Sequence, residues 1–245
     1  AADAAWRAGK IVMRHYQSGL VPEQKADASP VTIADRESER AIRQQLKAAF
    51  PDDGVMGEEH GELVGQSGRR WIIDPIDGTK SFVQGVPLFG VLIGLEVGDA
   101  AVVGAVYLPA LDELVCAASG HGCWWNGRRV RTSPVAELGS ACVCYTSSRS
   151  FATQGRAAAF DRVASRSRLV RGWGDCYGHI LVATGRAEVM LDPVMNPWDC
   201  APLQPILTEA GGTFTDWRGT ATIHGGDAVS TNGPLLGPVL DCLAS

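Results

Sequence analysis

The sequence lacks both an excess of positive charge and a hydrophobic run long enough to cross a membrane. Its 245 residues include 22 lysines and arginines against 27 aspartates and glutamates, which gives a net charge of −5. A nucleic-acid-binding face requires clustered basic residues, so we expect no nucleic-acid partner. The most apolar stretch, residues 86–97, is interrupted by proline and glycine and is shorter than the ~20 residues of a membrane span. No charged segment followed by an apolar one opens the chain, which predicts a cytoplasmic protein.

Cysteine and histidine lack the spacings of disulfide frameworks and zinc sites. The 7 cysteines are an odd number without a C-x-x-C pair, and the 5 histidines show no H-x-x-x-H spacing. This pattern favours reduced, mostly buried thiols. With 45% hydrophobic and 20% charged residues, the chain has the composition of a globular protein with a large core.

The most informative stretch is residues 71–79, which read WIIDPIDGT. The short, bulky apolar run predicts a buried strand, and Pro75, which lacks a backbone N–H, predicts that its ladder ends just after Asp74. Asp74 and Asp77 then lie close together and repel each other unless a cation or a proton intervenes. Gly78 allows the backbone to approach a ligand, and neighbouring N–H groups can face an anion. The stretch indicates a metal-assisted phosphate site; an acidic turn that merely leaves a strand is the alternative.

Further acids stand at the ends of predicted elements. Glu58 and Glu59 follow a short strand, and we expect one of them to face inward and the other to be solvated. Asp35 falls in the first turn of a helix predicted over residues 33–49, where a cap with Thr32 explains it as well as a catalytic role does. Asp199 stands at the start of a helix predicted over residues 200–210 and can point into a crevice.

The remaining pattern predicts a mixed α/β fold. Short strands over residues 90–131, with an Asn-Gly hairpin turn, predict an antiparallel meander, and residues 151–165 have helical character. We expect two halves, residues 1–135 and 136–245, that pack closely with a cleft between them.

Three segments carry a resemblance to a known family: GEE at 57–59, DPIDGT at 74–79 and WD at 198–199. Together they resemble the inositol monophosphatase family, within the sugar-phosphatase superfamily of magnesium-dependent, lithium-sensitive enzymes. The resemblance runs nearly end to end. It implies a layered α-β-α-β-α sandwich with largely antiparallel sheets, and a homodimer.

The resemblance also implies a magnesium site holding two or three ions. Glu58, Asp74 and the carbonyl of Ile76 match the ligands of the first Mg²⁺. Asp74, Asp77 and Asp199 match those of the second, so Asp74 bridges the ions and residues 1–135 carry most of the ligands. In the implied reaction, one metal activates a water that attacks phosphorus in line, and the other stabilises the leaving oxygen.

Other family roles match residues beside these acids. Gly78 and Thr79 match the backbone amides that hold the phosphate. The Thr79 hydroxyl, paired with Asp35, matches the catalytic dyad that takes a proton from the water. We expect Glu58 to be catalytic as well. Lys25 matches a basic residue at the edge of the metal site.

Two positions bear on the substrate, a small phosphate ester. Asp192 stands where inositol phosphatases typically carry a glutamate that contacts ring hydroxyls, and Asp175 replaces a small apolar residue. The runs at 174–177 and 223–226 resemble the histidinol-phosphate phosphatase branch. An added carboxylate suits the cationic amine of histidinol phosphate, whereas a neutral polyol gains less from it.

We therefore expect hydrolysis of L-histidinol phosphate, a step of histidine biosynthesis. Hydrolysis of myo-inositol 1-phosphate is the alternative reaction, and a plain helix N-cap is the alternative role for Asp175. A regulatory or RNA-associated adaptor that retains the phosphatase fold is the alternative from another class.

Overall fold

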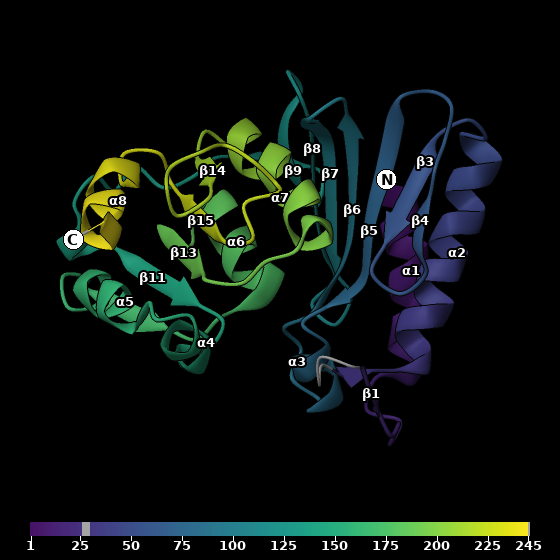
Figure 1. Cartoon of the computed structure of the whole chain (residues 1–245), viewed down its shortest axis with the longest axis horizontal. Helices are drawn as coiled ribbons and strands as arrows, with labels where there is room; N and C mark the ends of the chain where they lie inside the picture. The colour runs from purple at the N-terminus through teal and green to yellow at the C-terminus, as the bar shows by residue number, and fades with distance from the viewer. Residues whose placement is uncertain (26–29, 245) are drawn as a thin grey trace.

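Two β-sheets and three helical layers organise the structure, a computed structural model that describes residues 1–25 and 30–244 (Figure 1). The layers run helix, sheet, helix, sheet, helix, so the expected α-β-α-β-α sandwich is confirmed. None of the helices described is both long and apolar enough to cross a membrane.

The first sheet has eight strands in the order β10-β9-β8-β7-β6-β5-β3-β4. All its neighbours pair antiparallel except β3 and β5, which confirms the predicted meander over residues 90–131. Its strands are β3 (Gly54–Gly57), β4 (Gly61–Leu63), β5 (Arg69–Asp77), β6 (Gly90–Val97), β7 (Ala100–Leu108), β8 (Glu113–Ala118), β9 (Gly122–Trp125) and β10 (Arg128–Val130).

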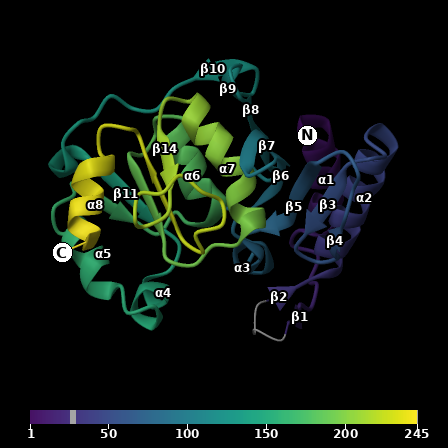
Figure 2. The ribbon, with the colours of Figure 1, turned by 45° about the horizontal axis from the view of Figure 1, so that its top comes forward.

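Helices α1 (Ala2–His15) and α2 (Ile33–Ala49) cover the outer face of this sheet (Figure 1). Their buried residues, among them Val12 and Ile42, pack on Ile73 and Ile93 of the sheet. At the lower end in Figure 2 lie the short pair β1 (Glu23–Gln24) and β2 (Pro30–Val31) and the helix α3 (Thr79–Val83).

The second sheet has five strands in the order β12-β11-β13-β15-β14. Strand β11 pairs parallel with both neighbours, and the other two pairs are antiparallel, so across both sheets antiparallel pairing dominates. The strands are β11 (Cys142–Tyr145), β12 (Leu169–Arg171), β13 (Val189–Asp192), β14 (Thr213–Thr215) and β15 (Ala228–Thr231).

Helices α6 (Asp175–Ala183) and α7 (Pro197–Glu209) form the layer between the sheets. The outer layer consists of α4 (Ser148–Thr153), α5 (Ala157–Ala164) and α8 (Leu236–Ala244), and the short turn η1 (Leu138–Ser140) precedes β11. The helical character expected over residues 151–165 is divided between α4 and α5, because Gly155 lies between them with φ of +68°, where a right-handed helix cannot continue.

Two glycines of the first sheet let α7 approach it closely. A Cβ on Gly104 would lie 2.0 Å from the Pro202 carbonyl oxygen, and one on Gly94 would lie 2.8 Å from the Ala201 Cβ. Neither position can carry a side chain without moving the helix. This contact sets where α7 begins relative to the end of β5. The boundary between the halves 1–135 and 136–245 stays a prediction.

Candidate active site

The two acids of the DPIDGT segment converge because β5 contains a bulge. The strand does not end after Asp74 as expected; it continues to Asp77, and its register with β6 shifts between those residues. The bulge accommodates Pro75, which has no N–H for the ladder. Residues three apart in a regular strand point to opposite faces, so the shift is also what lets both carboxylates reach one point.

Asp199 meets this pair from the second half of the chain. It is the third residue of α7, as the predicted position at a helix start required, and its Oδ2 accepts a hydrogen bond of 2.7 Å from the backbone N–H of Asn196. Carboxylate oxygens of Asp74, Asp77 and Asp199 all lie within 4.8 Å of one another. The group could hold a metal ion.

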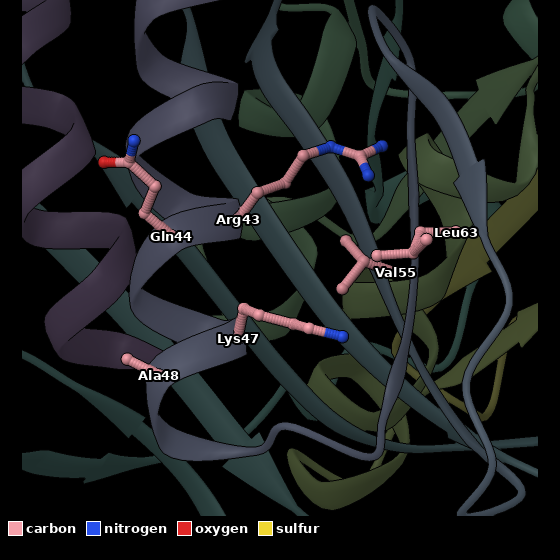
Figure 3. Close-up of a pocket in the computed structure, with 6 residues that line it drawn as sticks. All are labelled: Arg43, Gln44, Lys47, Ala48, Val55 and Leu63. Atoms are coloured by element: carbon pink, nitrogen blue, oxygen red, sulfur yellow. The ribbon is translucent and has the colours of Figure 1, made fainter.

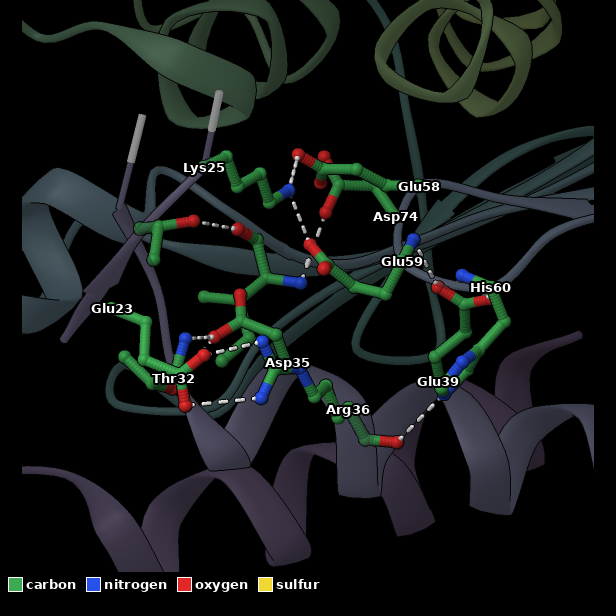
Figure 4. Close-up of polar contacts among 12 residues, drawn as sticks. Glu23, Lys25, Thr32, Asp35, Arg36, Glu39, Glu58, Glu59, His60 and Asp74 are labelled. Carbon is green, nitrogen blue, oxygen red and sulfur yellow. Dashed lines mark hydrogen bonds and ion pairs between the residues drawn. The ribbon is translucent and has the colours of Figure 1, made fainter. Parts of the chain in front are cut away.

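Glu58 and Glu59 share a cation at the edge of this group (Figure 4). Lys25 Nζ donates to Glu58 Oε1 at 2.7 Å and to Glu59 Oε1 at 2.5 Å. The expectation that one of the two acids is solvated is wrong, because the Glu59 side chain is only 7% exposed and that of Glu58 21%. One ammonium group neutralises part of the charge of both.

The acids line a polar cavity of about 210 Å³. Gly78 forms part of its wall with φ of +82°, and a Cβ there would lie 2.9 Å from the Leu88 carbonyl oxygen and 3.2 Å from Asp175 Oδ2. The position therefore requires glycine for both conformation and space. The other lining residues are Pro30, Glu58, Asp74, Ile76, Asp77, Thr79, Lys80, Asp175, Asn196, Trp198 and Asp199.

The pair of Asp35 and Thr79 implied by the resemblance is not closed in this structure. Thr79 Oγ1 donates to the Ile76 carbonyl oxygen at 2.9 Å. Asp35 Oδ2 accepts from the backbone N–H and the hydroxyl of Thr32, which completes the predicted capping box of α2. Its Oδ1 is buried without a hydrogen-bond partner among the described residues. Burial raises the pKa of Asp35 to about 6.

Asp175 and Asp192 lie beside a second, smaller cavity of about 80 Å³. Asp175 is the first residue of α6 and has φ of +53°, and the N-cap is Gly174, so the alternative role of Asp175 as a helix N-cap is wrong. A non-glycine residue in this region is strained by about 1 kcal/mol or more. The other lining residues are Asp77, Thr146, Cys176, Val194, Met195 and Asp199.

Two residues that sequence reasoning missed hold these acids in place. Thr146 Oγ1 accepts the Asp175 N–H at 2.8 Å. His179 is fully buried, with Nε2 at 3.3 Å from Asp192 Oδ2 and Nδ1 at 2.7 Å from Ser230 Oγ. His179 follows Asp175 by four residues and thus lies on the same face of α6, a signal that spacing offers but does not distinguish from core packing.

Electrostatically, the site favours a bound cation. Burial, followed by the charges of neighbouring acids, raises the pKa of Asp74 well above its usual range, and burial raises the pKa values of Asp77, Asp192 and Asp199 to about 7. Four buried or half-buried carboxylates this close together cannot all ionise at neutral pH without positive charge nearby. Oxygen-only donors suit Mg²⁺, so the residues fit the metal that the resemblance implies.

Comparison with known proteins places the chain among phosphatases. The profile of the inositol monophosphatase family matches residues 1–243. A histidinol-phosphatase from Chlorobaculum parvum is 47% identical over 96% of this chain and 92% of that protein, and one from Mycobacterium tuberculosis is 41% identical over 89% and 86%. A solved IMPase structure from Thermotoga maritima, 30% identical, superposes with a TM-score of 0.88 over 99% of this chain and 94% of that one.

The fold and the acid site thus define a phosphoric monoester hydrolase. More specifically, the chain belongs to the inositol monophosphatase family, and the resemblance carried by its short acidic segments is confirmed.

Replacing Asp77 with asparagine should stabilise the metal-free protein at alkaline pH. Because its pKa is raised to about 7 from 3.8, the folded state binds this proton more tightly than the unfolded chain, so stability is lost as pH rises from about 4 through 7. With a chelator present, Asp77→Asn should have a higher melting temperature than wild type at pH 8, by about 2–4 °C for each kcal/mol of repulsion that the substitution removes. The difference in melting temperature should shrink toward pH 4. Thermal denaturation at several pH values measures this.

The matched control is Asp53→Asn. Asp53 is also buried, but it accepts hydrogen bonds from Ser67, Arg69 and Trp71, so its loss should lower the melting temperature at pH 8. If metal-free Asp77→Asn melted below wild type at every pH, the account of a repulsive acid cluster would be wrong.

Proposed function

We propose that this phosphatase is Mg²⁺-dependent and hydrolyses L-histidinol phosphate to L-histidinol and phosphate, a step of histidine biosynthesis. The observation that carries the proposal is the small cavity beside the acid cluster, where the half-buried Asp175 and the buried Asp192 add two carboxylates to Asp77 and Asp199. Four acids around one small space favour a cationic ligand group. The names of the two histidinol-phosphatase relatives agree with this assignment.

The proposed metal ligands are the acids of the larger cavity. We assign Glu58, Asp74 and the carbonyl of Ile76 to one Mg²⁺, and Asp74, Asp77 and Asp199 to a second. The geometry that supports the second set is the convergence of its three carboxylates within 4.8 Å. Bound Mg²⁺ would supply positive charge to the phosphate oxygens and lower the pKa of the attacking water.

The chain's own groups would position the ester and move the proton. Gly78 and Thr79 would hold the phosphate through their backbone N–H groups. The left-handed backbone conformation of Gly78 supports this role. Asp35, through the Thr79 hydroxyl, would take a proton from the attacking water. Its unpartnered Oδ1 and a pKa raised to about 6 suit a general base near neutral pH. Lys25 would neutralise Glu58 and Glu59 at the cavity edge.

Attack by water fits the side chains around the site better than a covalent intermediate does. Cys176 lines the small cavity, but burial and the charge of Asp77 raise the pKa of its thiol well above the usual range. A thiol in that state is a poor nucleophile.

The shared fold does not by itself determine the substrate, the oligomeric state or the cellular location of the protein. Hydrolysis of myo-inositol 1-phosphate stays the alternative, favoured by the likeness to the Thermotoga maritima IMPase. The homodimer, the number of metal ions and lithium sensitivity rest on the family resemblance. Seven free cysteines, six of them buried, support a reducing compartment such as the cytoplasm. An RNA-associated adaptor is disfavoured by the complete set of acids and would show itself by RNA that stays bound through high salt.

Asp74→Asn and Asp199→Asn should each remain folded and lose at least about a thousandfold in turnover, since each removes a carboxylate that the proposed metal site needs. Phosphate release at saturating Mg²⁺ measures turnover, and circular dichroism checks the fold. Wild-type turnover in both variants would refute the site assignment.

Asp175→Asn tests the substrate. Asparagine tolerates positive φ, so the backbone at this position should hold while the charge is lost. For histidinol phosphate, kcat/KM should fall about tenfold, the cost of one charge-assisted hydrogen bond, while the value for myo-inositol 1-phosphate should not fall. If inositol phosphate were the better substrate of the wild type and the variant behaved identically, the proposed substrate would be wrong.

A further inference from the structure

A buried carboxylate outside the cavity holds the turn that carries Glu58. Glu39 lies on α2 with its side chain fully buried. Its Oε2 accepts the backbone N–H of Glu59 at 2.7 Å (Figure 4). Its Oε1 accepts the N–H of His60 at 3.2 Å and Arg43 Nε at 2.6 Å. Two of these three donors are backbone groups of the residues that immediately follow Glu58.

The same turn is also held by strand β5 of the first sheet. The N–H of Glu58 donates to the Ile73 carbonyl oxygen at 3.2 Å. A Cβ on Gly57 would lie only 2.1 Å from Glu39 Oε1, so glycine at this position is what allows the carboxylate to reach the turn. Residues 57–60 are therefore clamped between β5 and Glu39.

Arg43 completes the clamp from the protein surface. Its Nη2 donates to the Gly61 carbonyl oxygen while Nε pairs with Glu39, so one guanidinium both neutralises the buried acid and closes the hairpin. On its outer side Arg43 borders an open, mainly apolar cavity of about 510 Å³ (Figure 3), lined also by Gln44, Lys47, Ala48, Val55 and Leu63.

We propose that Glu39 is a positioning residue of the active site, which fixes the backbone of Glu58 so that its carboxylate faces Asp74 (Figure 4). The inference rests on the proposed role of Glu58 as a metal ligand. Glu39 lies outside the cavity, and its carboxylate accepts the backbone N–H groups of Glu59 and His60. Without these two hydrogen bonds the turn would be less firmly held. Arg43 pairs with the Glu39 carboxylate and offsets part of the charge.

The test is the Mg²⁺ dependence of Glu39→Gln. Glutamine keeps the volume, but its amide nitrogen must face one of three donors, so at least one hydrogen bond to the carboxylate is lost. The Mg²⁺ midpoint of activity should rise about tenfold, the cost of one charge-assisted hydrogen bond, with kcat at saturating Mg²⁺ within about twofold of wild type. The midpoint of the Mg²⁺-induced rise in melting temperature, measured without substrate, should shift by the same factor.

Asp53→Asn is the matched control, because Asp53 is a buried, fully hydrogen-bonded carboxylate at the opposite end of β3. It should lower the melting temperature and leave the Mg²⁺ midpoint unchanged. An equal shift in Asp53→Asn, or an unchanged midpoint in Glu39→Gln, would overturn the positioning role.

Glu58→Gln separates this inference from the proposed function. If Glu58→Gln leaves the Mg²⁺ midpoint unchanged, the metal-ligand assignment itself fails; if it shifts the midpoint and Glu39→Gln does not, only the positioning role fails. Should Glu39→Gln not fold, Arg43→Lys carries the test, because lysine keeps a positive charge beside Glu39 but lacks the forked donors that join Glu39 to the Gly61 carbonyl oxygen. A rise of about threefold in the midpoint is expected from the weaker clamp, and no rise would overturn the inference.

Discussion

Repulsion among closely spaced carboxylates, one buried and two half-buried, is the constraint on which the rest of this structure depends. Asp74, Asp77 and Asp199 are held within 4.8 Å of one another, although burial and mutual charge disfavour their ionised forms. The bulge in β5 brings Asp74 and Asp77 together, the N–H of Cys176 donates to Asp77, and the capping box at the start of α7 holds Asp199. A divalent cation between the three carboxylates can replace their repulsion with attraction, so an arrangement that is unfavourable without metal favours cation binding.

The two halves of the chain contribute different parts of the site, and the parts share residues. Asp77, Asp175 and Asp199 line both the larger and the smaller cavity. Carboxylates that would hold a metal are thus also walls of the space that would receive the substrate's cationic group. The close packing of α7 on Gly94 and Gly104 fixes Asp199 relative to the first sheet. Thr146 and His179 contact Asp175 and Asp192 beside the smaller cavity.

The positions of the clustered acids at the ends of elements could be predicted from proline, glycine and helix-capping signals, whereas the joining of Asp199 to Asp74 and Asp77 was implied by the family resemblance. The course of β5 past Pro75 could not be predicted, because a bulge depends on pairing with β6. The left-handed backbone of Asp175 could not be predicted either, because its N–H bonds to Thr146, 29 residues away. Asp35 and Thr79 instead bond to near neighbours, Thr32 and Ile76, and such local hydrogen bonds compete with the pair that the resemblance implies. Glu39 and Arg43 are four residues apart on α2, the spacing of an ordinary helix ion pair, and this spacing does not show that Glu39 reaches the turn after Glu58.

The most direct test of this account is the position of the metal. Crystals grown with Mn²⁺ in place of Mg²⁺ would give an anomalous signal from each bound ion. We predict one peak between Asp74, Asp77 and Asp199 and a second between Glu58, Asp74 and the Ile76 carbonyl. Peaks only at other surface acids, with the three clustered carboxylates hydrogen-bonded to one another through shared protons, would contradict it.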